Sequence, residues 1–154
     1  MKSTVEKKEI SEALNLVASV AEKRQSIPVL SNILLKAEKT GLTLIATDLE
    51  IELTFKISKI ELTNEGETTV SARKLADLTR SVPEDTVLTF ELIENQLEIR
   101  ALKFQADFSI LPVGDFPVIE IQEFDREVAL PGKELADLIE KTSFAMASQD
   151  VRYY

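Results

Sequence analysis

The chain has 154 residues with 27 acidic and 18 basic side chains, and its net charge of −9 argues, taken alone, for a soluble protein and against a nucleic-acid partner. It contains neither cysteine nor histidine, which excludes disulfides and thiolate metal sites and removes the most frequent general base. No apolar run approaches the roughly 20 residues that cross a bilayer, and the N-terminus lacks the apolar segment of a secretory signal, so we expect a cytoplasmic location.

The first part of the chain predicts one strand, one helix and three more strands. Apolar residues recur at helical spacing over residues 8–22, and Pro28 excludes a continuation of this helix. The last strand alternates strictly between apolar and polar side chains, which gives it one apolar sheet face. The expected strands are residues 3–5, 33–37, 42–46 and 51–57.

The second part of the chain repeats this order of elements. Residues 72–81 predict a shorter helix that ends before Pro83. Its motif RKLADL, at residues 73–78, returns as KELADL at residues 133–138, and KEISEA at residues 8–13 is a fainter copy. The expected strands are residues 67–71, 87–92, 97–101 and 104–110. We therefore interpret the chain as a protein of β-α-β-β-β repeats, the alternative being chance similarity between amphipathic helices.

The remainder of the chain predicts the beginning of a third unit. Residues 111–126 contain two prolines and a glycine and are expected to form a linker. A strand at residues 128–130, a helix from Lys133 and a truncated strand should follow. The expected organisation is a first domain over residues 1–120, with repeats 1–62 and 66–112, and then residues 121–154 as linker and beginning of a second domain. This organisation indicates a fragment of a longer repeat protein.

Five segments of the chain are specific in sequence, and general β-propensity does not explain LPVGDFP and QDVRYY within them. The five segments are SIPVLSNILL, LTLIATDLEIEL, TTVSARKLADL, FSILPVGDFP and FAMASQDVRYY. In this order they resemble the sliding clamps of bacterial DNA replication, the beta subunits of DNA polymerase III, and they cover essentially the whole chain. The resemblance implies an α+β DNA clamp fold, with antiparallel sheets on the outside and two helices on one side that faces a channel. In that family, two chains of three such domains each join head to tail into a ring around duplex DNA.

The function that this resemblance implies is that of a processivity factor, which encircles duplex DNA and tethers the replicative polymerase. Such a subunit catalyses nothing itself, although it serves a nucleotidyltransferase complex, and the resemblance implies no cofactor and no metal. The implied partners are double-stranded DNA, a second copy of the chain, and the polymerase and clamp loader, which bind through a linear motif. The alternatives are an interaction module of the same repeat without DNA binding, and a carboxylate-based hydrolase.

The negative net charge is compatible with such a clamp, because only the helices that face the channel need to be basic. The second predicted helix has Arg73, Lys74 and Arg80 against a single acid, Asp77, whereas the third predicted helix is more acidic. The resemblance implies DNA contacts by Arg24, Arg73, Gln149, Tyr153 and Tyr154. From the residues alone, the arginines would be solvated surface residues and the tyrosines ordinary strand residues.

Two further surfaces follow from the resemblance. Arg152 and Tyr154 correspond to part of the cleft that accepts the linear motif. The head-to-tail subunit interface would include Lys74, Phe104, Ala106 and Phe108. For Phe108, an ordinary core position is an equally good interpretation. The carboxylates of Asp48, Glu50 and Glu52 are interpreted as exposed groups at a turn and on an outward sheet face, rather than as an acid–base or metal site.

Overall fold

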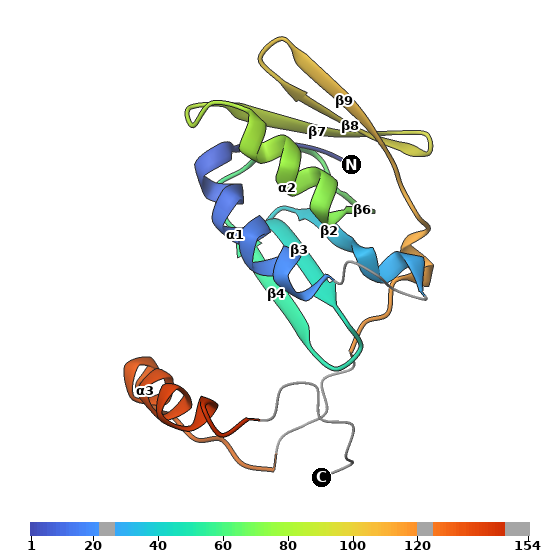
Figure 1. Cartoon of the computed structure of the whole chain (residues 1–154). Helices are drawn as coiled ribbons and strands as arrows, with labels where there is room; N and C mark the ends of the chain where they lie inside the picture. Colours follow the sequence, from blue (N-terminus) through green and yellow to red (C-terminus); the bar gives the residue numbers. More distant parts are fainter. Residues whose placement is uncertain (22–26, 120–124, 147–154) are drawn as a thin grey trace. The chain divides into compact units, whose positions relative to one another are not determined.

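The computed structural model describes residues 1–21, 27–119 and 125–146, and the chain divides into two compact units, Met1–Ile119 and Glu120–Tyr154 (Figure 1). The elements of the first unit are β1 (Lys2–Glu6), α1 (Lys7–Val20), η1 (Pro28–Ser31), β2 (Asn32–Glu38), β3 (Gly41–Thr47), β4 (Glu52–Ile57), β5 (Glu61–Asn64), β6 (Gly66–Ser71), α2 (Ala72–Ser81), β7 (Val87–Ile93), β8 (Gln96–Ala101), β9 (Phe104–Ser109) and η2 (Val113–Asp115). The second unit has one described helix, α3 (Gly132–Ser143). No helix in the described part of the chain is long and apolar enough to span a membrane.

Two antiparallel sheets form the first unit, with strand orders β5-β1-β7-β8-β9 and β4-β3-β2-β6. Strand β1 of the first repeat pairs with β7 of the second, and β6 of the second repeat pairs with β2 of the first. Each repeat therefore places its first strand in the sheet of the other. The predicted α+β fold of two β-α-β-β-β repeats is confirmed.

Helices α1 and α2 lie side by side in Figure 1 and contact each other and the sheets. Their apolar faces share one core with both sheets, in which Leu14 of α1 and Leu75 of α2 meet Leu44 of β3 and Phe90 of β7. Full burial of such a side chain stabilises the fold by about 1.5–3 kcal/mol. This shared core fixes the two helices against each other and so determines which side chains they expose.

Helix α2 begins and ends where the sequence predicts. The Ser71 hydroxyl accepts a hydrogen bond from the Lys74 backbone N–H at 3.5 Å and caps the N-terminus. At the other end, the buried Nζ of Lys7 donates to the Val82 carbonyl oxygen at 2.8 Å, just beyond the last helical residue. A cation at this end of a helix also interacts favourably with the helix dipole. Lys7 therefore connects the start of α1 to the end of α2.

Strand β5 is absent from the sequence prediction. It pairs with β1 at the edge of its sheet, and most of its residues are exposed. An exposed edge strand of four residues has no alternation of apolar side chains, so periodicity gives no signal for it.

The expected linker is in part wrong. Residues 111–119, here called the strap segment, belong to the first unit, because Phe116 is only 5% exposed and packs with Leu34 and Ile45 on the face of the four-stranded sheet opposite the main core. The backbone N–H of Leu111 also donates to the Thr69 hydroxyl at 2.9 Å, and that hydroxyl donates to the Leu111 carbonyl at 2.8 Å. Prolines and a glycine obscure this anchoring in the sequence.

In the second unit, the expected helix is present as α3, but the expected strand at residues 128–130 is wrong. These residues form no strand, and Val128 and Leu130 are exposed. A strand needs a partner for its backbone groups, and β-propensity alone does not supply one. The expected truncated strand at residues 151–154 lies outside the described residues.

Candidate nucleic-acid interface

The exposed face of α2 carries a short basic stripe. Burial of Leu75 and Leu78 orients the helix, and this leaves Arg73, Lys74 and Arg80 exposed to solvent. Arg73 and Arg80 are seven residues apart, so they lie on the same side of the helix, two turns from each other. Their side chains are 80% and 67% exposed. The stripe thus offers three long cationic side chains to an anionic partner.

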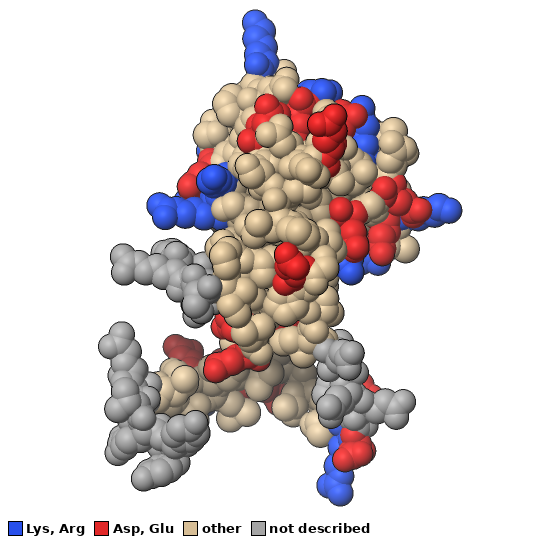
Figure 2. Space-filling view, turned by 90° about the vertical axis from the view of Figure 1, so that its right-hand side faces the viewer, with Lys and Arg blue, Asp and Glu red and all other residues tan. Residues whose placement is uncertain are grey.

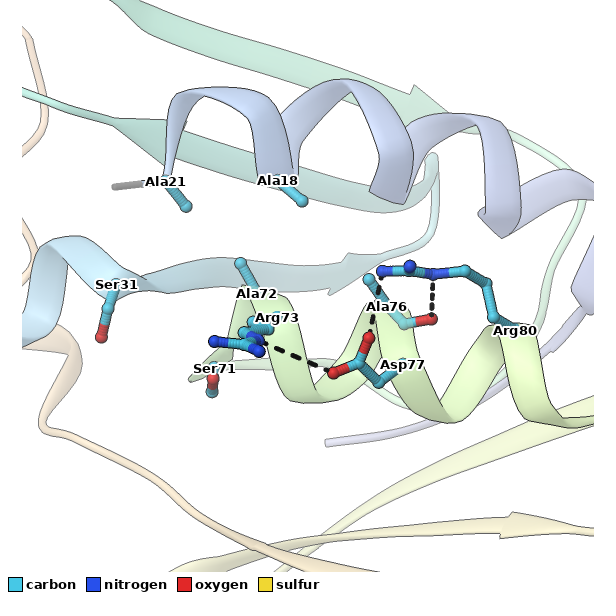
Figure 3. A pocket seen from close by; sticks show the side chains of 9 residues that line it. All are labelled: Ala18, Ala21, Ser31, Ser71, Ala72, Arg73, Ala76, Asp77 and Arg80. Atoms are coloured by element: carbon cyan, nitrogen blue, oxygen red, sulfur yellow. Dashed lines mark hydrogen bonds and ion pairs between the residues drawn. The ribbon is translucent and has the colours of Figure 1, made fainter. Parts of the chain in front are cut away.

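A single acid, Asp77, lies between the two arginines on this stripe. Its Oδ1 is 3.1 Å from Nη2 of Arg80, and its Oδ2 is 3.9 Å from Nε of Arg73. Arg80 also donates from Nε to the Ala76 carbonyl oxygen at 3.2 Å. Figure 3 shows the Arg80 guanidinium reaching toward the carboxylate, whereas Arg73 approaches it through Nε. Arg80 is therefore held more closely than Arg73.

A groove of about 510 Å³ runs beside the stripe, between α1 and α2. Its lining residues are Ala18, Ala21, Ser31, Ser71, Ala72, Arg73, Ala76, Asp77 and Arg80. Most of these side chains are small, so the two guanidinium groups are the large polar groups at its rim (Figure 3). Guanidinium groups present several N–H donors in a plane, a geometry that suits the oxygens of phosphate.

Apart from Asp77, the stripe is basic, and a group of acidic side chains lies on one of the sheets. Glu91, Glu98 and Asp107 are cross-strand neighbours on the face of the five-stranded sheet that points away from the core. Ion pairs compensate part of this charge, those of Glu91 with Lys2 at 3.1 Å and with Arg100 at 3.4 Å, and that of Glu98 with Arg100. Figure 2 shows acidic side chains gathered over the upper part of one face of the molecule. A negative net charge and a basic helix face therefore coexist in one fold.

The structure describes only one of the predicted DNA-binding residues, Arg73. Arg73 is exposed on α2 as expected for such a role. The others, Arg24, Gln149, Tyr153 and Tyr154, lie outside the described residues, as does Arg152 of the predicted motif cleft. Arg80 was not predicted as a site residue, although its spacing of seven from Arg73 already placed it on the same stripe.

The residues predicted for the subunit interface lie in different environments. Lys74 is exposed on α2, and Phe104 is 49% exposed on the edge strand β9. Ala106 is partly buried against the core, and Phe108 is 9% exposed and belongs to it. Phe108 is thus a core aromatic in this chain, the second of the two interpretations that the sequence allowed.

An apolar hollow of about 650 Å³ adjoins the exposed Phe104. It is lined by the end of α2 and by the turn between β8 and β9, where Leu102 is exposed and has a positive φ of 55°. A large apolar residue in this backbone region is uncommon, and such residues often mark functional surfaces.

Two of the three carboxylates in residues 48–52, those of Asp48 and Glu52, accept hydrogen bonds from backbone groups. Oδ1 of Asp48 accepts hydrogen bonds from the backbone N–H of Ile51 at 2.7 Å and of Glu50 at 3.0 Å, and these bonds lower the pKa of Asp48 below its ordinary value. Glu52 accepts one from the backbone N–H of Ile119 at 3.0 Å. Among the residues that the structure describes, no group of carboxylates is arranged to hold a metal ion.

Comparisons with known proteins connect this chain and its fold to one family. Residues 1–121 match the family model for the DNA polymerase III beta subunit, N-terminal domain. The beta sliding clamps of Pseudomonas putida and Escherichia coli are 42% and 36% identical to the chain over 154 residues, which is 100% of this chain and 42% of each relative. The chain therefore spans less than half the length of these curated relatives.

Solved structures give the same result. The crystal structure of the DNA polymerase III subunit beta from Pseudomonas aeruginosa has a TM-score of 0.94 at 40% identity, covering 100% of this chain and 42% of that one. The pol III beta of Caulobacter crescentus has a TM-score of 0.94 at 36% identity, covering 100% and 41%. The resemblance found in the sequence is thereby confirmed. The chain belongs to the DNA polymerase III beta subunit family.

Proposed function

We propose that this chain is part of a DNA sliding clamp, a processivity factor that encircles duplex DNA and tethers the replicative polymerase. The observation that supports the proposal most directly is the basic stripe of Arg73, Lys74 and Arg80 on a helix of a clamp-family fold, with Glu91, Glu98 and Asp107 on the outer face of a sheet. The clamp would contribute attraction to DNA and a topological tether, and the chemistry would belong to the polymerase.

The stripe would contact DNA through phosphates. Phosphates carry no base identity, so such contacts hold a duplex without selecting a sequence. Arg24, Gln149, Tyr153 and Tyr154 would add further contacts to DNA. Their assignment rests on the family resemblance.

The remaining partners belong to other surfaces. The exposed Phe104, the apolar hollow beside it and the edge of strand β9 would form half of a head-to-tail contact with a second copy, and Lys74 would belong to the same interface. Arg152 and Tyr154 would contribute to a cleft for the linear motif of polymerase and loader. No cofactor takes part in this proposal, and the site of action would be the cytoplasm, where bacterial DNA is replicated.

The test is an NMR titration of the ¹⁵N-labelled chain with short DNA duplexes of two unrelated sequences at low ionic strength. The backbone signals of α2 should shift equally with both duplexes, and added salt should reverse the shifts because phosphate contacts release counterions. Arg73→Glu should reduce the shifts. An interaction module that does not bind DNA would show no shift at any salt concentration. Shifts confined to the outer faces of the sheets would contradict the assignment of the stripe.

A further inference from the structure

Asp77 lies between the two arginines of the basic stripe and contacts both of them. It lies four residues after Arg73 and three before Arg80, which are the two spacings at which helical side chains meet. The pair in which the acid precedes the base is the better oriented one, and it is also the shorter, at 3.1 Å against 3.9 Å. One carboxylate therefore engages the two arginines of the stripe that line the groove.

These contacts are weak enough to be exchanged. The side chains of Asp77, Arg73 and Arg80 are 57%, 80% and 67% exposed, and exposed ion pairs shift an equilibrium by only up to about fivefold. Arg80 also uses one N–H on the Ala76 carbonyl oxygen at 3.2 Å, which keeps its guanidinium close to the carboxylate. A phosphate that approaches the groove must therefore replace Asp77 as the ion-pair partner of both arginines.

We propose that Asp77 competes with DNA phosphate for Arg73 and Arg80 and so limits how long a duplex stays bound to the stripe. The inference rests on the proposed function and adds the regulation of that same surface. A protein that moves along DNA needs attraction to the backbone, and it also needs contacts that break readily. If Asp77 pairs with each arginine again as a phosphate leaves, the free-energy barrier to movement along DNA is lower. Without Asp77, the three cations of the stripe would hold the duplex longer.

The decisive variant is Asp77→Asn, which keeps the shape of the side chain and removes its charge. In the same duplex titration, this variant should bind about two- to fivefold more tightly than the parent. Its plot of log affinity against log salt should also be steeper, by up to about 0.9 for each arginine that becomes free to contact a phosphate. The matched control is Asp115→Asn, which makes the same change in net charge on the strap segment, outside the groove.

Two further variants separate the possible outcomes. In a chain with Arg73→Gln and Arg80→Gln, Asp77→Asn should have no more effect than Asp115→Asn, because the carboxylate then has no arginine to release. If the double glutamine variant binds DNA as well as the parent, the stripe is not the DNA surface and the proposed function fails at this point. If the double variant weakens binding but Asp77→Asn behaves like Asp115→Asn in the parent, only the competition is refuted. Thermal melting of each variant shows that the fold is retained.

Discussion

Replacing Lys7 with methionine should destabilise the first unit by removing the cation that connects its two helices. The Lys7 side chain is 7% exposed, and its Nζ is 2.8 Å from the Val82 carbonyl oxygen and 2.8 Å from Oε1 of Glu84. Methionine retains most of the apolar stem, so the change isolates the ammonium group. The Val82 carbonyl would lose its buried partner, and the end of α2 would lose a favourable charge.

The two contacts of Lys7 differ in weight. A buried polar group that loses its partner costs about 1–3 kcal/mol, and a cation at a helix C-terminus contributes about 0.3–1 kcal/mol. The Glu84 side chain is 78% exposed, so its ion pair should contribute little. We therefore expect Lys7→Met to lower the free energy of unfolding by about 2 kcal/mol, and Glu84→Gln by less than about 0.5 kcal/mol.

Urea unfolding followed by circular dichroism measures both variants. A loss of about 2 kcal/mol corresponds to a fall in melting temperature of roughly 6–8 °C for a unit of this size. The reasoning is refuted if Glu84→Gln costs as much as Lys7→Met, because the stabilisation would then come from the surface ion pair. It is equally refuted if Lys7→Met costs less than about 0.5 kcal/mol, since the Val82 carbonyl would then need no partner.

Three further changes test other parts of the first unit. Gly41→Ala should cost more than about 2 kcal/mol in urea unfolding, because Gly41 has a φ of 135° and an added Cβ would lie 2.2 Å from the Ile57 carbonyl oxygen. Phe116→Ala should cost about 3–5 kcal/mol and make the strap segment accessible to protease, whereas a protected segment would contradict its anchoring role. The pKa of Asp48 is lower in the folded state, so its backbone hydrogen bonds stabilise the fold above the unfolded-state pKa, and this stabilisation is lost as pH falls through the folded-state pKa. The parent chain should therefore lose its stability advantage over Asp48→Asn on acidification. An advantage that does not depend on pH would contradict this account.

The sequence is most informative where local chemistry decides the structure. Ser71 and Pro83 delimit α2, and helical spacing correctly predicts that Leu75 is buried and Arg73 exposed. Spacing also brings Asp77 within reach of both arginines, although their unequal distances follow only from the structure.

The sequence is least informative where a neighbouring element determines whether a segment forms a strand or a side chain is buried. Residues 128–130 are β-prone, but no strand among the described residues pairs with them, whereas β5 is a strand because it pairs with β1. Phe104 and Phe108 both point to the inner side of β9, and alternation treats them alike. Only the packing shows that Phe108 reaches the core while Phe104 extends past its edge.

The exchange of first strands explains why the basic stripe depends on the whole unit. Because β1 lies between β5 and β7, and β6 lies beside β2, neither repeat can complete its own sheet. The helices then pack over sheets that both repeats build, and Lys7 of the first repeat closes the end of the second repeat's helix. The position of Arg73 and Arg80 is thus determined by residues from both repeats. A change that loosens either repeat should weaken the presentation of this surface even when no cation on it has been altered.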